Sequence, residues 1–257
     1  MFLLNQRLRK APLIINNSTM IKQALILAGG LGSRLGGLTK ETPKPMLLVG
    51  GRPFIEYLIW NLKRQGINKI VISIGHKAKK FINYIESELK YIENIVYVQE
   101  YEPMGTGGAV KLASSELDSE FLVINGDSLF DLDYMNLIKF SKEFPNSMVA
   151  VALRQVTDNS RYGKILIDGE KIKEFIEKKD INNNNLINGG VYVIKKEVLE
   201  LIPDGNSSLE HDLFPKLAHH ELIIGKKCDG YFIDIGIPLD YNRSQIELPK
   251  WKKLASR

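Results

Sequence analysis

Residues 27–35 read Leu27-Ala28-Gly29-Gly30-Leu31-Gly32-Ser33-Arg34-Leu35 and continue the apolar run Ala24–Leu27. A short apolar run that enters a glycine-rich loop predicts a buried strand. Glycines in such a loop let backbone N–H groups approach a polyphosphate without side chains in the way. Arg34 adds a planar guanidinium that suits phosphate oxygens. The stretch therefore predicts a strand that leads into a phosphate-binding loop.

Two other kinds of phosphate-binding loop fit these residues less well. A Rossmann fingerprint needs a third glycine where Leu35 stands, and an acidic residue after the second strand, where Gly75-His76 stands. A Walker A loop needs Gly-Lys-Ser/Thr, but Leu38 follows Gly37. For the loop taken alone, a glycine-rich turn without a ligand also stays open.

Outward from the loop, the N-terminal half alternates between predicted strands and predicted helices. Apolar runs predict strands at Lys69–Ile74, Ile95–Gln99 and Phe121–Ile124. Helical spacing and stop signals predict helices at Pro53–Gln65, Phe81–Leu89 and Gly107–Ser115. This alternation favours an α/β fold with a mainly parallel sheet that helices cover on both faces.

The C-terminal half has a different rhythm. Lys164–Ile167 and Lys171–Phe175 predict a β-hairpin with a type I′ turn at Asp168-Gly169. Further strands are predicted at Ser147–Leu153 and Leu186–Ile194, and helices at Leu209–Leu217 and Leu239–Ile246. No linker or internal repeat divides the chain. We expect one domain at 20–247, a dispensable N-terminal extension at 1–19 and a basic C-terminal tail at 248–257.

Composition and charge exclude several function classes. The chain has 257 residues and a single cysteine, Cys228, so no internal disulfide framework is expected. It shows neither a secretory signal nor an apolar run near the ~18 residues of a membrane helix, so a cytoplasmic protein is expected. The net charge of +5 comes from the two tails, without which 28 basic residues face 30 acidic ones. Neither nucleic acid nor a membrane is expected as a partner.

The glycine loop continues into Pro43-Lys44-Pro45, and the complete pattern resembles the sugar-1-phosphate nucleotidyltransferase family. The flanking prolines hold Lys44 rigid, which a solvated surface lysine would not need. The resemblance runs from about Ile21 to Ile246 and implies a single Rossmann-like domain. It implies that Arg34 and Lys44 neutralise the triphosphate and the attacking sugar phosphate. It also places the nucleotide against Leu27, Ala28, Gly29, Gly30, Gly32 and Ser33.

Two aspartates are candidates for a metal site. Asp127 follows the predicted strand Phe121–Ile124, and Asp234 lies in Tyr231–Gly236. The carboxyl ends of strands are where open α/β sheets build their sites. Two carboxylates suit one Mg²⁺, and the resemblance puts this pair on the metal. Each aspartate alone could instead cap a helix or form a turn.

Asp131-Leu132-Asp133 forms a D-x-D pattern, which marks metal sites in many nucleotide-sugar-dependent glycosyltransferases. Here Asp133 is expected to cap a helix that begins near Tyr134. The glycosyltransferase hypothesis leaves the Arg34 loop and Pro43-Lys44-Pro45 unexplained, and it is kept as the alternative from a different class.

Three later segments resemble the sugar-phosphate side of the family. They offer Gly163 for a close backbone approach, Glu177 and Asn188 for sugar hydroxyls, and Lys178 for the phosphate. A mixture of carboxylate, amide and backbone groups is sensible chemistry for a polyol. For Glu177–Lys179 alone, a solvated strand end remains the alternative.

The segment Glu100–Gly108 resembles the base-binding loop of the family and contributes Glu100, Gly105 and Thr106. Gly105 would let a base edge meet backbone groups. Glu100 could accept from two donors on one edge, and guanine presents N1–H and N2–H₂ there, whereas uracil presents a single N–H.

Within the family, the chain resembles the D-glycero-D-manno-heptose 1-phosphate guanylyltransferases. That likeness is carried by Ser160–Gly163, Ser208–Lys216 and Tyr231–Pro238. It implies transfer of GMP from GTP to the heptose 1-phosphate, with Mg²⁺ as cofactor and pyrophosphate as the second product. A uridylyltransferase or another mannose- or glucose-type enzyme stays open, as does a homo-oligomer.

Overall fold

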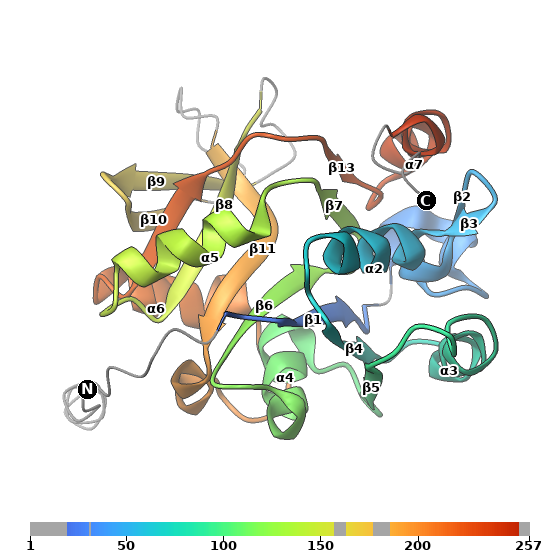
Figure 1. Cartoon of the computed structure of the whole chain (residues 1–257), viewed down its shortest axis with the longest axis horizontal. Helices are drawn as coiled ribbons and strands as arrows, with labels where there is room; N and C mark the ends of the chain where they lie inside the picture. The colour runs from blue at the N-terminus through green and yellow to red at the C-terminus, as the bar shows by residue number, and fades with distance from the viewer. Residues whose placement is uncertain (1–19, 31, 157–162, 177–185, 252–257) are drawn as a thin grey trace.

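The computed structural model describes residues 20–30, 32–156, 163–176 and 186–251. In these residues a mixed sheet of nine strands runs in the order β5-β4-β1-β6-β11-β8-β12-β10-β9 (Figure 1). Its strands are β1 Gln23–Ala28, β4 Lys69–Ile74, β5 Ile95–Gln99, β6 Glu120–Asn125, β8 Val149–Gln155, β9 Lys164–Asp168, β10 Lys171–Ile176, β11 Leu186–Lys195 and β12 Ile223–Lys227.

Two small sheets and a set of helices complete this part of the chain. The small sheets pair β2 Leu48–Val49 with β3 Arg52–Pro53, and β7 Ser128–Phe130 with β13 Phe232–Asp234. The α-helices are α2 Phe54–Arg64, α3 Ala78–Glu88, α4 Gly105–Leu112, α5 Tyr134–Glu143, α6 Phe214–His219 and α7 Pro238–Glu247. Short 3₁₀ turns cover Ser33–Thr39, Lys44–Met46, Ala113–Glu116, Lys196–Leu201 and Leu248–Lys250.

The N-terminal half of the large sheet is parallel, and its strands β1, β4 and β6 are buried on both faces. β1 pairs in parallel with β4 and β6, and β4 pairs in parallel with β5. Successive side chains of β1 point to opposite faces, so Ala24 and Ile26 belong to the core cluster that includes residues of α2, α3 and α5, while Leu25 belongs to the cluster that includes residues of α4 and α6. The predicted α/β class with helices on both faces is confirmed, and the sheet as a whole is mixed.

The C-terminal half of the sheet is mostly antiparallel. β11 pairs antiparallel with β6 and β8, and β10 pairs antiparallel with β9 and β12, whereas β12 and β8 are parallel. The predicted hairpin is present as β9–β10 at the edge of the sheet. Parallel pairing is therefore concentrated around β1, where short crossovers through helices connect the strands.

The hairpin turn differs from its prediction. Asp168 pairs with Lys171, so the two turn residues are Gly169 and Glu170. Gly169 has φ of 58°, while Glu170 has no positive φ. A type I′ turn needs positive φ at both central positions, so that prediction was wrong, and a single positive φ at the first position fits type II′.

The helix predicted at Leu209–Leu217 is also different in the structure. A π-helical turn covers Leu209–Leu213, and α6 begins at Phe214. Pro215 lacks the N–H that a continuous α-helix would need at that position, and the Phe214 N–H reaches back to the Leu209 carbonyl instead. The segment therefore changes its hydrogen-bond pattern just before the proline.

The packed structure continues beyond residue 247. Leu248 is fully buried, and the Trp251 side chain packs edge-on against Trp60. The predicted extension 1–19, Leu31, and the predicted sugar-side residues Glu177 and Lys178 lie outside the described residues. Among the residues that are described, no helix is both long and apolar enough to cross a membrane.

Candidate active site

Parallel pairing brings four segments of the sequence together at the carboxyl ends of β1, β4, β5 and β6. The glycine loop follows β1, Gly75 follows β4, Glu100 follows β5, and Asp127 follows β6. The Gly29 carbonyl accepts the His76 N–H at 3.3 Å, and the Leu27 carbonyl accepts the Gly126 N–H at 2.9 Å. Because parallel strands end at the same edge, residues far apart in the sequence surround the loop.

The glycines of the loop meet different surroundings. A Cβ on Gly29 would lie 2.0 Å from Glu100 Oε1, so only glycine fits there. A Cβ on Gly30 would meet no atom within 4 Å. Gly32 has φ of 67°, and its carbonyl accepts the Thr39 hydroxyl at 3.0 Å, which fastens the far end of the loop. Ala28 is buried and Leu27 is half-buried, while Ser33 and Arg34 are exposed beyond them.

Glu100 is held under the loop as a buried carboxylate. It is 7% exposed, and its Oε1 accepts the Ser73 hydroxyl at 2.7 Å. Its Oε2 accepts the Met104 N–H at 3.4 Å. Ser73 was not predicted, although it is the one hydroxyl in the otherwise apolar strand core Ile70–Ile74. Such a polar residue in a buried strand is a signal that could have identified it.

Lys44, Asp127 and Asp234 meet beside the loop. Lys44 lies in the 3₁₀ turn between its two prolines, is 8% exposed, and places Nζ 2.7 Å from Asp127 Oδ2. Antiparallel pairing of β7 with β13 sets Ser128 opposite Asp234, and the Ile235 N–H bonds to the Asp127 carbonyl at 2.9 Å. Two short strands thus bring together aspartates from distant parts of the chain.

The electrostatics of this pair favour a bound cation. Burial, together with the negative charge of Asp127, raises the pKa of Asp234 to about 6. The Gly236 N–H at 2.6 Å from Oδ1, Lys44 and Arg34 act in the opposite direction. Arg34 Nη2 lies 3.5 Å from where a Cβ of Gly236 would be, so the guanidinium faces the same place.

The donor set of the two aspartates fits Mg²⁺. Both are carboxylates, and in the described residues no third His, Cys, Asp or Glu joins them in a cluster. Mg²⁺ is usually held by one or two carboxylates and completes its coordination with waters and substrate phosphate oxygens. The glycine loop, Arg34 and Lys44 adjoin the two aspartates.

The predicted base-binding residues Gly105 and Thr106 lie at the start of α4. Gly105 has φ of 68°, and a Cβ there would lie 2.3 Å from the Ser207 carbonyl. That carbonyl accepts the N–H groups of Gly107 and Gly108 at 2.8 and 3.3 Å. The Thr106 hydroxyl donates to Glu210 Oε2 at 2.7 Å and accepts the Leu209 N–H at 2.8 Å. The hydroxyl of Thr106 is therefore engaged by the protein itself.

Of the predicted sugar-side residues that the structure describes, Asn188 lies on β11 and Gly163 lies just before β9. Asn188 stands beside an irregularity of β11, where Gly190 has φ of 70°. Its Oδ1 accepts the Gly190 N–H at 2.9 Å, and its Nδ2 donates to Tyr192 Oη at 2.8 Å. Gly163 is exposed and directly precedes β9. Sequence reasoning did not identify Tyr192 or Glu210, although Glu210 lies in a segment that the family resemblance had singled out.

The D-x-D aspartates have structural partners. Asp131 is 8% exposed, pairs with Arg64, and accepts the Trp251 indole N–H at 3.1 Å. Asp133 accepts the Asn136 N–H at 3.0 Å and caps α5, which confirms the predicted cap. Asp131 is engaged by partners inside the fold and Asp133 by the first turn of α5, which removes the support for the glycosyltransferase hypothesis.

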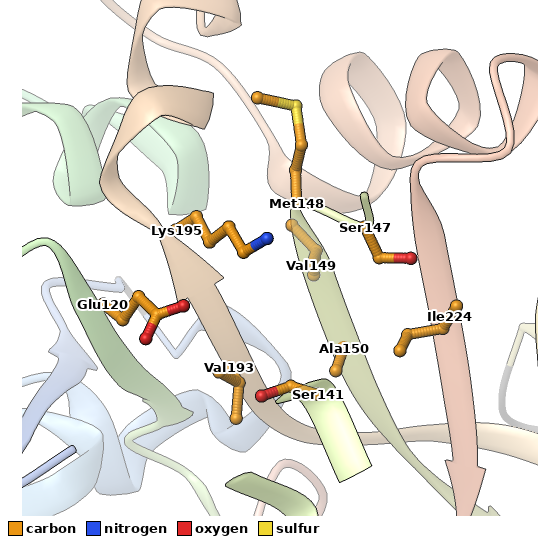
Figure 2. A pocket seen from close by; sticks show the side chains of 9 residues that line it. All are labelled: Glu120, Ser141, Ser147, Met148, Val149, Ala150, Val193, Lys195 and Ile224. Atoms are coloured by element: carbon orange, nitrogen blue, oxygen red, sulfur yellow. The ribbon is translucent and has the colours of Figure 1, made fainter. Parts of the chain in front are cut away.

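A small cavity lies at the opposite edge of the sheet (Figure 2). It is lined by Glu120 at the start of β6, Val149 at the start of β8 and Lys195 at the end of β11, with Ser141 of α5 beside them. It has room for about one water molecule. Because the cavity lies at the ends of the strands away from the glycine loop, it is separate from the candidate active site.

The fold and the site define the class of protein. Residues 23–249 match the nucleotidyl transferase family, and the chain belongs to that family. It is 36% identical over 222 residues to the D-glycero-alpha-D-manno-heptose 1-phosphate guanylyltransferase of Campylobacter jejuni, which covers 85% of this chain and 96% of the relative. The enzyme of the same name from Aneurinibacillus thermoaerophilus is 37% identical over 228 residues, which covers 88% and 98%.

A solved structure agrees with these relatives. The crystal structure of HddC from Yersinia pseudotuberculosis complexed with GMP-PN matches with a TM-score of 0.77 and 34% identity, over 89% of this chain and all of that chain. The family predicted from the glycine loop and Pro43-Lys44-Pro45 is confirmed, and the chain is a nucleotidyltransferase.

Proposed function

We propose that the chain is a sugar-1-phosphate guanylyltransferase that transfers GMP from GTP to D-glycero-α-D-manno-heptose 1-phosphate. The observation that carries this proposal is the meeting of Lys44, Asp127 and Asp234 beside a glycine loop that ends in Arg34. The names of the relatives support the guanylyl and heptose parts of the proposal.

The chemistry needs no covalent intermediate. A phosphate oxygen of the sugar phosphate forms a bond to the α-phosphorus of GTP, the bond from that phosphorus to the bridging oxygen breaks, and pyrophosphate leaves with the electron pair. Arg34 and Lys44 neutralise charge on the triphosphate and on the attacking phosphate. Glycine N–H groups and the two cations hold both reactants in line, and such positioning supplies much of the rate.

Asp127 and Asp234 would hold Mg²⁺, which when bound supplies positive charge to phosphate oxygens. Lys44 already contacts Asp127 Oδ2, so it lies where it can serve the carboxylate and a phosphate together. Asp127 Oδ1 has a weaker partner, the Ser128 hydroxyl at 3.2 Å. This leaves Asp127 Oδ1 and the Asp234 carboxylate as the groups that would hold Mg²⁺.

Glu100 would read the guanine edge. The Ser73 hydroxyl and the Met104 N–H fix its carboxylate, yet each oxygen keeps lone pairs for further donors. Guanine supplies N1–H and N2–H₂ to such a carboxylate. A buried carboxylate left without those donors is costly, so bases that lack them should be rejected.

A substrate matrix tests the whole proposal. Pyrophosphate release is measured for five nucleoside triphosphates against heptose, mannose and glucose 1-phosphates. The proposal expects the highest kcat/KM for GTP with the heptose 1-phosphate, and slower turnover of mannose 1-phosphate, which lacks one hydroxyl-bearing carbon. Faster turnover of UTP than GTP with every sugar phosphate would overturn the guanylyl assignment.

Inosine triphosphate isolates the role of Glu100, because it keeps N1–H and lacks the 2-amino group. The unmodified enzyme should prefer GTP over inosine triphosphate, and Glu100→Gln should reduce that preference about tenfold, because a neutral amide oxygen accepts less strongly. Glu102→Gln, an exposed position in the same loop, is the matched control. An unchanged preference in Glu100→Gln would show that another group reads the base.

A further inference from the structure

Among the described residues, Glu210 accepts hydrogen bonds from three neutral hydroxyls. Its Oε1 accepts the Tyr192 hydroxyl at 3.1 Å, and its Oε2 accepts the Thr106 and Ser208 hydroxyls at 2.7 and 3.0 Å. It lies in the π-helical turn Leu209–Leu213, a kind of irregularity that is frequent at functional sites. Hydrogen bonds to a charged acceptor are stronger than neutral ones, so this carboxylate can fix all three hydroxyls.

One branch of the network leads to the sugar side. Tyr192 is fully buried, and burial together with the charge of Glu210 raises the pKa of its phenol well above the ordinary value, so the phenol stays protonated. Its hydrogen points to Glu210, and its oxygen accepts from Asn188 Nδ2 at 2.8 Å. The Gly190 N–H at 2.9 Å fixes the other end of the Asn188 amide. Asn188 is therefore held in one orientation.

The second branch leads to the base side. Thr106 is the second residue of α4, and its hydroxyl both donates to Glu210 and accepts from the Leu209 N–H. Shortly before Leu209 in the chain, the Ser207 carbonyl accepts the N–H groups of Gly107 and Gly108 in the first turn of α4. Segment 207–210 thereby fixes the amino end of α4, where Gly105 approaches the base in the proposed function.

We propose that Glu210 is a positioning residue that connects the two substrate sides, holding Asn188 through Tyr192 and the start of α4 through Thr106. The naming of the two sides rests on the proposed function. In-line transfer depends on the relative placement of nucleotide and sugar phosphate, and a displacement of about 1 Å can cost on the order of 10²-fold. One carboxylate that orients groups on both sides fixes that relative placement.

Three variants separate the two branches. Tyr192→Phe removes one oxygen and should raise KM for the sugar phosphate about tenfold, with little change in KM for the nucleotide. Thr106→Val should raise KM for the nucleotide and leave KM for the sugar phosphate nearly unchanged. Glu210→Ala should raise both KM values about tenfold and lower kcat, because it disconnects both branches.

Tyr84→Phe is the matched control. It removes a hydrogen bond of the same kind, from Tyr84 to Glu56 between α3 and α2, away from the site. It should lower thermal stability and leave both KM values unchanged. If Glu210→Ala and Tyr192→Phe behave like this control, Glu210 is only structural and the proposal is overturned. If Glu210→Ala does not fold, the other two variants still test the proposal. Tyr192→Phe should raise mainly KM for the sugar phosphate, and Thr106→Val should raise mainly KM for the nucleotide.

The substrates for this test are the nucleotide and sugar phosphate that the unmodified enzyme turns over fastest. A preferred pair other than GTP and the heptose 1-phosphate would contradict the proposed function and leave the coupling measurable. Unchanged KM values for whichever pair is used would contradict the coupling alone.

Discussion

Two pairs of aspartates lie near the end of β6 and differ in the groups that their side chains contact. Asp127 and Asp234 are far apart in the sequence, yet β7 and β13 bring them together beside Lys44. Asp131 and Asp133 are almost adjacent, yet one is held by Arg64 and Trp251 and the other caps α5. The difference teaches that the tertiary partners of a carboxylate, more than its sequence spacing, decide whether it joins a cluster of charged groups or stabilises a local element of the fold.

The largest effect is expected from the first pair. Asp127→Asn or Asp234→Asn removes a charge and keeps the shape, so turnover should fall by roughly 10²–10³-fold or more. The fold should survive, because burial already disfavours the charge on Asp234. Pyrophosphate release at saturating Mg²⁺ and thermal unfolding measure the two effects. Near-normal turnover in both variants would show that Asp127 and Asp234 are no more important for turnover than Asp131 and Asp133.

The glycine loop provides a second test of the comparison, because residues distant in the sequence also limit the space around it. In Gly29→Ala the new Cβ would fall 2.0 Å from the fixed Glu100 carboxylate, which should lower kcat/KM for GTP by about 10²-fold. Gly37→Ala is the control, since a Cβ there meets nothing within 4 Å. Equal kcat/KM values in the two variants would show that the loop tolerates displacement.

The second pair should affect stability and spare activity. Asp131→Asn breaks a mostly buried ion pair with Arg64 and weakens the contact with Trp251. The free energy of unfolding should fall by about 1–3 kcal/mol, between the values typical of exposed and of fully buried ion pairs, because Arg64 is partly exposed. Urea unfolding measures this fall. A loss of turnover per folded molecule, similar to that of Asp234→Asn, would return Asp131 to the list of metal ligands.

The smallest effect is expected at the helix cap. Asp133→Ala removes the acceptor of the Asn136 N–H and should cost about 1 kcal/mol of stability. Asp133→Asn keeps an acceptor and should cost less. Turnover should be unchanged in both variants, and a selective loss of Mg²⁺-dependent activity would contradict the structural role.

Local patterns predicted the N-terminal half of the fold well, because its strands are apolar runs that helices cover on both faces. They also placed Glu100 and Asp127 at strand ends, and parallel strands bring their ends to one edge. The position of Asp234 came from family resemblance, since β13 is three residues long and depends on pairing with β7. Periodicity could not reveal the partners of Glu210 or Asp131, because hydroxyl and indole contacts between distant segments leave no local signal.

The most direct test of the central claim is the reverse reaction, measured with pyrophosphate and the GDP-activated heptose. The enzyme should form GTP and heptose 1-phosphate, Asp234→Asn should lose this activity, and Asp131→Asn should keep it once corrected for the folded fraction. Release of GDP without any requirement for pyrophosphate, or full activity in Asp234→Asn together with loss in Asp131→Asn, would contradict the account.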